Sequence, residues 1–332
     1  MRIGITYDLR NDYLSLGLGE EETAEFDRQD TIDSIDRTLQ ELGYVTDRVG
    51  NIKKLVPRLA GGERWDFVFN IAEGLQGFGR EAQVPALLDA YQIPYTFSGP
   101  LSLTVTLHKG IAKHVVRGFG VPTPDFIVVK SEHDLAEVNL PFPVFVKPVA
   151  EGTGKGITAA SKVSGRTELV SQCTRLLGEY RQPVIVEAYL PGREFTVGIV
   201  GTDDQARAVG VMEVILKDHA EQNAYSYINK ERCEELVEYR AVCDDNADKA
   251  KEIALAAWRA LGCRDAGRID LRADGEGRIN FLEANPLPGL HPEHSDLPIL
   301  CTMSGISYRE LLGWIVQSAK RRMSGEWPMI GG

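Results

Sequence analysis

Residues 267–286 restrict the fold of this chain more than any other stretch, because they predict a β-hairpin with polar side chains on one face. Two apolar strands flank an Asp-Gly-Glu-Gly turn, a composition typical of hairpin connections. Residues two apart on a strand share a face, so Glu283 lies beside Asn285. The same spacing puts Arg268 beside Asp270. A four-residue loop would place Asp270 directly opposite Glu283, whereas a two-residue loop would make them diagonal neighbours.

Two carboxylates and an amide oxygen therefore converge on this face. Bare carboxylates so close repel each other, and one would be driven to protonate. A divalent cation removes the conflict, and oxygen ligands with room for water and phosphate suit Mg²⁺. The alternative is a solvated face with scattered charges, but Phe281 beside Glu283 argues against a fully open face.

Two lysines and a glycine-rich segment are candidate phosphate contacts. Lys147 ends an apolar strand, where an ammonium is costly to bury unless an anion meets it. Lys109 lies in a predicted helix, and each lysine alone is equally consistent with a surface position. The segment 151–156, Glu-Gly-Thr-Gly-Lys-Gly, would let backbone N–H groups approach phosphate oxygens. It is neither a Walker loop nor a dinucleotide fingerprint, and a plain flexible hairpin would look the same.

Two glutamates are candidate contacts to a nucleoside. Glu187 ends one apolar strand and Glu194 begins the next. A carboxylate in either place can accept hydrogen bonds from an adenine amino group or from ribose hydroxyls. A pair of turn carboxylates without a ligand is the simpler alternative.

The alternation of strands and helices up to about residue 100 predicts a parallel α/β unit. We expect strands at 2–7, 44–49 and 66–70, and helices at 23–42 and 80–91. A β-rich part follows, with strands at 126–129, 144–147, 157–161 and 184–187 and helices at 101–119 and 166–180. The last part has strands at 194–200 and 208–215, helices at 245–261 and 307–322, and the hairpin. We predict three domains, 1–100, 101–190 and 191–332, with clefts between them.

Charge and composition limit the partners. Among 332 residues, 37 are basic and 48 acidic, which gives a net charge of −11 and no bulk basic surface for nucleic acid. No stretch approaches the roughly 20 apolar residues that cross a bilayer, and the first residues predict a strand rather than a signal peptide. The five cysteines lack metal or disulfide spacing and predict reduced core thiols. We expect a cytoplasmic protein that binds neither nucleic acid nor membrane.

Taken in order, these pieces resemble the ATP-grasp superfamily and, within it, the D-alanine–D-alanine ligase branch. The resemblance covers nearly the whole chain from about residue 65. It implies an ATP-grasp fold of mixed α/β and α+β class, preceded by a Rossmann-like N-terminal domain. The matching segments are Leu107–Lys109, Val146–Pro148, Glu151–Gly156, Glu187–Leu190, Gly192–Thr196, Gly267–Asp270 and Leu282–Gly289.

The resemblance also implies a role for each matching residue. The expected nucleotide contacts are Lys109, Lys147, Gly154, Glu187, Ala188, Leu190, Glu194 and Phe281. The expected catalytic residues are Thr153, Lys230, Arg268 and Gly289, the last two steadying an oxyanion. Asp270, Glu283 and Asn285 would ligate two Mg²⁺ ions, with Mn²⁺ as an alternative.

The reaction implied is activation of a carboxylate by ATP. A substrate carboxylate attacks the γ-phosphate to give an acylphosphate, and an amine then attacks the acyl carbon to give an amide. The substrates would be amino-acid-like acids and amines, and a homodimer is the family expectation. A lid that excludes water is expected because an acylphosphate hydrolyses readily.

The N-terminal region departs from the family pattern. The family's Gly-Gly-x-Ser-x-Glu motif is missing after the first strand, and of its Tyr-Lys pair only Lys230 matches. ATP-dependent ligation is therefore better supported than D-alanine as substrate. Candidate substrate contacts are Asp8, Glu73, Lys230 and Ser295.

Three alternatives stay open for the function and one for a metal. The chain is a dipeptide-forming ligase of unspecified substrate, a genuine D-alanine–D-alanine ligase of peptidoglycan synthesis, or a non-catalytic nucleotide-binding protein. The i,i+3 pair His291 and His294 has a spacing that could bind zinc, but a structural or substrate-facing role is favoured.

Overall fold

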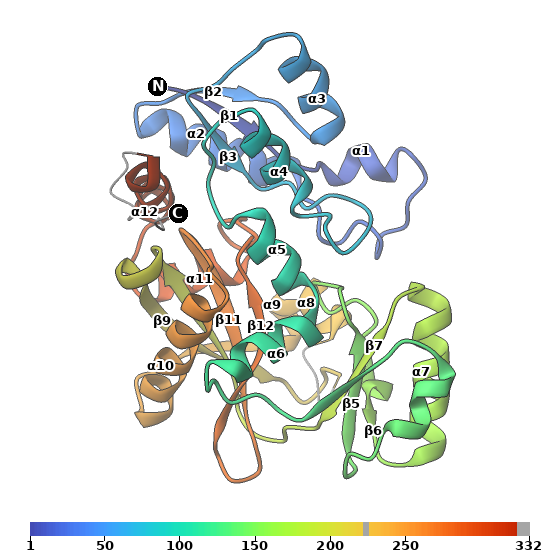
Figure 1. Ribbon diagram of the computed structural model, residues 1–332. Coiled ribbons are helices and arrows are strands. Elements are labelled where there is room, and N and C mark those ends of the chain that lie inside the picture. The colour runs from blue at the N-terminus through green and yellow to red at the C-terminus, as the bar shows by residue number, and fades with distance from the viewer. Residues whose placement is uncertain (222–225, 324–332) are drawn as a thin grey trace.

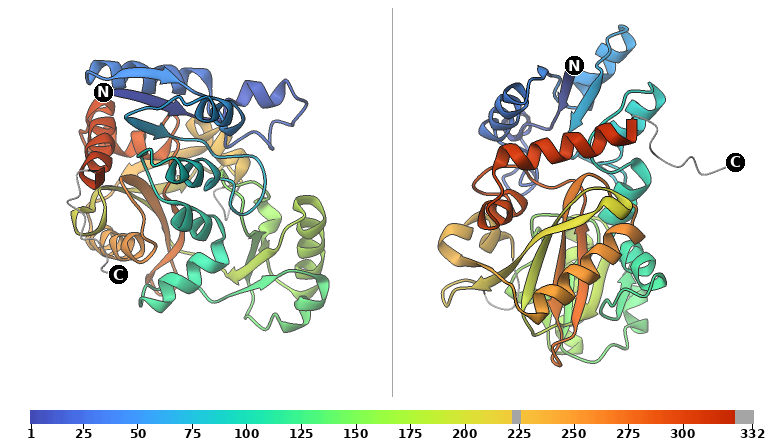
Figure 2. Two further views of the ribbon diagram at one scale, coloured as in Figure 1. Left: turned by 45° about the horizontal axis from the view of Figure 1, so that its top comes forward. Right: turned by 90° about the vertical axis from the view of Figure 1, so that its left-hand side faces the viewer.

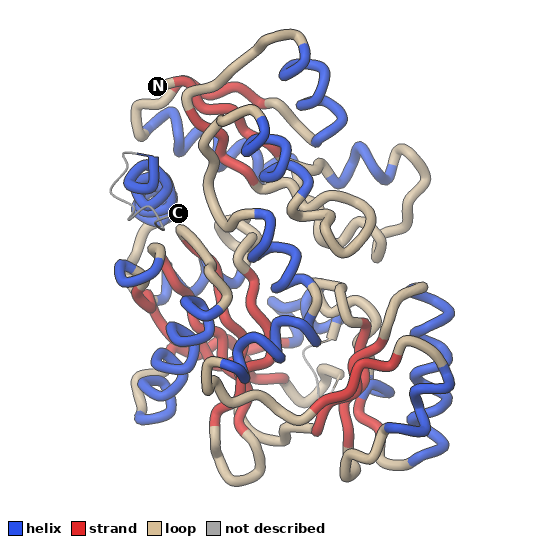
Figure 3. The backbone as a smooth tube through the Cα atoms, viewed as in Figure 1, coloured by secondary structure: helices blue, strands red, loops and turns tan. Residues whose placement is uncertain are grey.

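The computed structural model describes residues 1–221 and 226–323, and the strands in these ranges form three sheets (Figures 1 and 3). Each sheet falls within one of the three ranges predicted as domains, and the boundaries at residues 100 and 190 stay predictions. A helix, α12 (Tyr308–Met323), lies between the first sheet and the third (Figure 2).

The first sheet is parallel, as the alternating pattern predicts, with strand order β2-β1-β3. Its strands are β1 (Arg2–Thr6), β2 (Val45–Arg48) and β3 (Phe67–Asn70). The helices of this region are α1 (Arg10–Leu14), α2 (Gln29–Glu41), α3 (Ile52–Ala60) and α4 (Gln83–Ala90). Helix α2 buries Ile32, Ile35 and Leu39 completely, which is the helical spacing read from the sequence.

Helix α2 begins six residues later than the predicted 23–42. The N–H of Asp27 donates to the Asp8 carbonyl at 3.0 Å, and the N–H of Arg10 donates to the Asp27 carbonyl at 2.9 Å. These bonds hold the backbone of Asp27 in a bridge to the end of β1, so it cannot join the helix.

The predicted helix 101–119 is two helices, α5 (Pro100–Leu107) and α6 (Lys109–Gly118). The break falls at His108, whose backbone is extended with φ −86° and ψ 92°. Its Nδ1 accepts the N–H of Ile111 at 3.2 Å and so caps α6. The break places Lys109 at the first turn of a helix, beside the other two sheets.

The second sheet is antiparallel, with order β4-β7-β5-β6, and packs on helix α7 (Arg166–Tyr180). Its strands are β4 (Phe126–Val129), β5 (Val144–Pro148), β6 (Lys162–Val163) and β7 (Val184–Ala188). Short 3₁₀ helices cover Glu132–Glu137 and Ala159–Ser161. The predicted strand 157–161 is wrong, because the Thr158 hydroxyl accepts the N–H of Ala160 and caps the 3₁₀ turn there.

The third sheet has order β10-β9-β8-β11-β12 and is antiparallel throughout. Its strands are β8 (Glu194–Val200), β9 (Arg207–Leu216), β10 (Val237–Ala241), β11 (Ala266–Ala273) and β12 (Ile279–Asn285). A 3₁₀ turn, Asp203–Gln205, links β8 to β9. Helices α6 and α10 (Asp245–Ala260) share one apolar core with this sheet. The remaining helices are α8 (Tyr227–Glu231), α9 (Cys233–Leu236) and α11 (Asp296–Met303).

The hairpin β11–β12 places Asp270 directly opposite Glu283. Its loop has five residues rather than four or two, and a bulge at Leu282 restores the register. The bulge turns Phe281 away from Glu283 and into the core, where it is fully buried, and Leu282 takes its place on the polar side. The prediction of Phe281 as a nucleotide contact is therefore wrong.

Four of the cysteines are buried reduced thiols, as predicted, whereas Cys243 is exposed between β10 and α10.

Candidate active site

Hairpin side chains form a tight polar cluster. The Asp270 carboxylate accepts hydrogen bonds from the Thr196 hydroxyl at 3.0 Å and from the Asn285 amide at 3.1 Å. Arg268 pairs with the same carboxylate and also lies 3.4 Å from Asp296. Burial and the facing Glu283 raise the pKa of Asp270 although Arg268 opposes them. The protonated form of Asp270 is therefore favoured by its surroundings.

Lysine side chains surround the second hairpin carboxylate. Lys109 Nζ lies 3.3 Å from Glu283 Oε2 and donates to the Glu151 carbonyl at 2.5 Å. Burial alone would raise the pKa of Glu283, but Lys109 and Lys147 lower it well below its usual range. Both lysines are buried beside carboxylates.

Glu187 lies behind the lysines in a buried ion-pair cluster. Lys147 Nζ lies 2.8 Å from one Glu187 oxygen and Lys113 Nζ lies 3.0 Å from the other. Burial lowers the pKa of Lys113 to about 8, and the two ammonium groups lower that of Glu187 to about 2 against its burial. Lys113 was not predicted, although it follows Lys109 by four residues and so shares its helical face.

Two adjoining cavities meet at this cluster. The smaller, of about 70 Å³, lies between the second and third sheets. It is lined by Lys109, Phe145, Lys147, Glu151, Gly154, Ile157, Glu187, Ala188, Tyr189, Leu190, Glu194, Thr196, Lys230, Asp270, Arg272, Leu282 and Glu283. The larger, of about 480 Å³, is bounded by the first and third sheets and the glycine-rich segment. Lys109, Glu151, Lys230 and Glu283 line both, so they stand at the junction.

Most of the predicted nucleotide contacts line the smaller cavity. Glu194 lies 3.1 Å from Arg272, and burial raises its pKa despite this pair. The N–H of Ala188 already donates to the Asp125 carbonyl at 2.8 Å, so it is not available to a base. Tyr189 and Arg272 also line this cavity and were not predicted.

The glycine-rich segment reaches from the second sheet to the first region. Thr153 and Gly154 both have a positive φ, of 51° and 71°. A Cβ at Gly154 would lie 2.7 Å from the backbone nitrogen of Tyr227. Lys155 pairs with Glu25 at 2.7 Å and with Glu151 at 2.5 Å. The segment is thus held closely against neighbouring chain on two sides.

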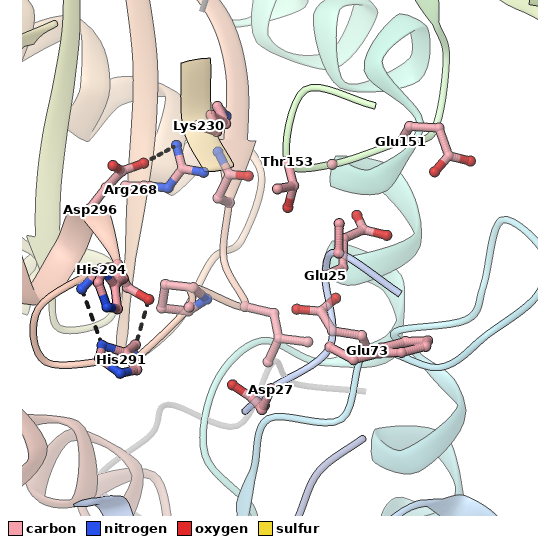
Figure 4. A pocket seen from close by; sticks show the side chains of 18 of the residues that line it. Glu25, Asp27, Glu73, Glu151, Thr153, Lys230, Arg268, His291, His294 and Asp296 are labelled. Carbon is pink, nitrogen blue, oxygen red and sulfur yellow. Dashed lines mark hydrogen bonds and ion pairs between the residues drawn. The ribbon is translucent and has the colours of Figure 1, made fainter. Parts of the chain in front are cut away.

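Predicted catalytic and substrate residues line the larger cavity, namely Glu73, Thr153, Lys230, Arg268, Gly289 and Ser295 (Figure 4). The Ser295 hydroxyl accepts the N–H of His291 at 2.9 Å and so stabilises the turn before α11. Asp8 does not line this cavity; it accepts the Gly74 N–H at 2.9 Å and the Tyr13 hydroxyl, and is 2% exposed. The structure therefore gives Asp8 a place in the scaffold.

The two histidines each lie beside a carboxylate. His291 Nε2 lies 3.3 Å from Asp30, and His294 Nδ1 lies 3.1 Å from Glu234. Within residues 1–221 and 226–323, no three His, Cys, Asp or Glu side chains group as a metal site, so the pair lacks a third such ligand. This supports the structural or substrate-facing interpretation.

Sequence and structure comparisons identify the family. A family model described as the D-ala D-ala ligase C-terminus matches residues 115–317. The D-alanine–D-alanine ligase of Rhizobium meliloti (strain 1021) is 32% identical over 285 residues, covering 85% of this chain and 89% of its own. The uncharacterized protein y4sG of Sinorhizobium fredii (strain NBRC 101917 / NGR234) is 31% identical over 305 residues, covering 88% of each chain.

Solved structures show the same fold. The D-alanine–D-alanine ligase of Bacillus anthracis, solved in complex with ATP, superposes with a TM-score of 0.74 at 22% identity. The match covers 98% of this chain and 100% of that one. The chain has the ATP-grasp architecture and belongs to the D-alanine–D-alanine ligase family. This membership confirms the predicted fold class and the predicted enzyme class, an ATP-dependent ligase. None of the helices in the described ranges has the length and apolar character to cross a membrane.

Proposed function

We propose that this protein joins a carboxylate to an amine through an acylphosphate, at the expense of ATP and with Mg²⁺. The observation that carries the proposal is the junction of the two cavities, where Lys109 and Glu283 stand between the smaller cavity, here called the nucleotide slot, and the larger cavity, here called the chamber. A γ-phosphate at the inner end of the slot would lie against the chamber that holds the attacking carboxylate.

Each part of the cluster has a distinct task in this proposal. Lys109 and Lys147 neutralise the phosphates, whose negative charge their buried ammonium groups can meet without reorganisation. Adenine lies along Glu187–Leu190, and Glu194 accepts from the ribose. Arg268 and the N–H of Gly289 donate to the oxyanion that forms when the amine attacks. Lys230 and Thr153 hold the phosphate end of the slot from opposite sides.

The hairpin oxygens fit a magnesium ion. Asp270 and Glu283 are paired across the strands, and the Asn285 amide N–H already donates to Asp270, which leaves its carbonyl oxygen to face a cation. Hard oxygen ligands of this kind are those Mg²⁺ prefers. When bound there, Mg²⁺ would neutralise charge on the phosphates during transfer.

A genuine D-alanine–D-alanine ligase is the second candidate. The name of the Rhizobium meliloti relative favours it. The missing N-terminal motif argues for a different acid. Release of ADP with D-alanine as the sole substrate would separate the two.

The decisive experiment is Asp270→Asn. We expect the rate of ADP release to fall by about two orders of magnitude, because one metal-binding charge is lost from the transition state. The fold should persist, since Thr196 can still donate to the amide oxygen and Arg268 keeps Asp296 within 3.4 Å. Initial rates with MgATP and amino-acid mixtures measure the effect, with circular dichroism to check the fold.

Asp248→Asn is the matched control. Asp248 lies on α10, its side chain is 72% exposed, and it lines neither cavity. Its variant should keep the wild-type rate. A near-wild-type rate in Asp270→Asn would refute the metal assignment, and tight ATP binding without turnover on any acid would favour a nucleotide-binding protein.

A cytoplasmic location and a homodimer are further parts of the proposal.

A further inference from the structure

One wall of the larger cavity carries three carboxylates from separate parts of the first region. Asp27 precedes α2, Glu73 follows β3, and Glu81 precedes α4. Figure 4 shows Asp27 and Glu73 on the side of the pocket opposite Arg268 and Asp296. The topology of the parallel sheet brings these loops to one edge, so the wall is a product of the fold.

Asp27, Glu73 and Glu81 are the carboxylates of the larger cavity that have no cation closer than 4.0 Å among the described residues. Among the described residues, the side-chain carboxylates of Asp27 and Glu73 have no hydrogen-bonded or ion-paired partner. Glu81 is 9% exposed, and its nearest cation is Arg80 at 4.0 Å. Arg80 is already committed, with two bonds of 2.9 Å to Glu25 and one of 3.0 Å to the Ala150 carbonyl.

Every other acidic side chain of the cavity lies within 3.9 Å of a Lys, Arg or His nitrogen. The pairs are Glu25–Lys155, Glu151–Lys155, Glu231–Arg10, Glu234–His294, Glu235–Arg232, Glu283–Lys109 and Asp296–Arg268. The contrast shows that the unpaired wall is local and is not a general excess of acid.

The pKa of each of the three wall carboxylates is raised, as expected where no cation neutralises them. Burial and the repulsion of Glu81 raise the pKa of Glu73 well above its usual range. Burial, with the nearby Glu25, raises the pKa of Glu81 to about 7. Burial and Asp8 raise that of Asp27. A buried carboxylate without a partner is costly, and a bound cation would remove that cost.

We propose that the acid activated in this cavity is a diamino acid, whose two ammonium groups lie against Asp27, Glu73 and Glu81. The inference rests on the proposed function, which places the reacting carboxylate at the junction beside Lys109. A neutral amino acid carries one ammonium and would leave most of the wall unneutralised. The cavity volume of about 480 Å³ is within the usual range of small-molecule sites.

The test compares acids that match in length and differ in the second amino group. Lysine is paired with norleucine and 2,4-diaminobutyrate with 2-aminobutyrate, in both stereochemical forms, with MgATP and a common set of amines. We expect kcat/KM for ADP release to favour each diamino acid by about tenfold or more, the value of one charged hydrogen bond. Equal or better use of norleucine or 2-aminobutyrate would overturn the inference.

A binding measurement separates this inference from the proposed function. Calorimetry without ATP should show tighter binding of lysine than of norleucine in at least one stereochemical form. Such a preference without ADP release from any acid would contradict the ligase proposal and support the cation-binding wall. If lysine is preferred neither in binding nor in turnover, the assignment of the wall as a cation-binding site is overturned.

Substitutions in the acidic wall test which carboxylates cause the preference for a diamino acid. Glu73→Gln should reduce the lysine-to-norleucine ratio of kcat/KM by about tenfold, because one carboxylate no longer meets an ammonium. Asp27→Asn, at a separate loop, should reduce the same ratio if Glu73→Gln folds poorly. Glu235→Gln is the control, since Glu235 lines the cavity but pairs with Arg232 and is 64% exposed. A ratio unchanged in both wall variants would contradict the assignment.

Discussion

At the scale of single residues, the buried charges behind the nucleotide slot hold Lys147 in position and make the slot sensitive to substitution. Lys113 and Lys147 hold Glu187 between them at 3.0 and 2.8 Å. Burying such charges is expensive, and the attraction offsets the cost only while every partner is present. The cluster therefore fixes Lys147 in place before ATP arrives, and it makes the slot sensitive to the loss of any member.

Glu187→Gln tests this cluster through its pH dependence. The pKa of Glu187 is lowered from 4.5 to about 2 in the fold, so the carboxylate stabilises the protein above pH 4.5. That contribution, about 3 kcal/mol from the shift, is lost as the pH falls toward 2. Urea titrations of wild type and variant should differ by a constant amount down to about pH 4.5 and converge below it.

The control for this experiment is an exposed acid. Asp248→Asn should change the free energy of unfolding little at any pH, because surface charges contribute weakly. A wild-type-to-Glu187→Gln difference that persists unchanged below pH 3 would show that packing rather than charge stabilises the cluster.

Sequence patterns predicted the positions of site residues best where a regular strand or helix sets their spacing. For the hairpin, the sequence left Asp270 either opposite Glu283, with a four-residue loop, or diagonal to it, with a two-residue loop. The strand pairing has them opposite, but through a five-residue loop and a bulge. The period of two along the hairpin misplaced Phe281, because a bulge inverts the faces and leaves no mark in the sequence. The acidic wall was only partly foreseen, since Asp27 and Glu81 reach the cavity through loops whose course depends on tertiary packing.

At the scale of elements, the glycine-rich segment 151–156 is the part that we propose contacts the phosphates. Its backbone turns at Thr153 and Gly154, where φ is positive. Gly154 also lies where any side chain would meet the backbone nitrogen of Tyr227 at 2.7 Å. The glycine is thus required both by conformation and by the closeness of α8.

Gly154→Ala should therefore weaken ATP binding with a smaller effect on the fold. The added methyl group would push the segment away from Tyr227 and from the phosphates, and we expect KM for ATP to rise by about tenfold, corresponding to one lost hydrogen bond. Initial rates over a range of ATP concentrations measure this.

Gly178→Ala is the comparison variant in the same part of the chain. Gly178 lies within α7 with open space around its Cα, so alanine should stabilise the helix by about 0.5–1 kcal/mol and leave KM unchanged. An unchanged KM in Gly154→Ala would mean that the segment does not contact the nucleotide.

Element boundaries were predicted well where periodicity and chain breakers agree. The strand 126–129 and the helix 166–180 have the same bounds in the structure. Prediction failed at 157–161, where a hydroxyl cap stabilises a 3₁₀ turn in a β-branched stretch. The short helices α1, α3, α8 and α9 lack a long periodic face and were not predicted.

At the scale of the whole molecule, the apolar cores do not follow the sheets one to one. The core under the first sheet includes Ile3 and Phe69 together with Leu311 and Leu312 of α12. The N-terminal region is therefore packed against the end of the described chain. The second sheet has a separate core with α7, built from residues such as Val144 and Leu169. The other face of this sheet packs against Leu107 of α5 through Ile185, so the second sheet has a core of its own and one smaller apolar contact with the rest of the chain.

Three buried cysteines report on these cores one by one. Cys173 lies in the core of the second sheet, Cys263 in that of the third and Cys301 in that shared by the first sheet and α12. We expect a pulse of thiol reagent in rising urea to label Cys173 first, and Cys263 and Cys301 later, because the smaller core buries less apolar surface. Exposed Cys243 should react at once without urea and calibrates the reagent. Simultaneous labelling of the three buried thiols would show that the second sheet unfolds only with the rest of the chain.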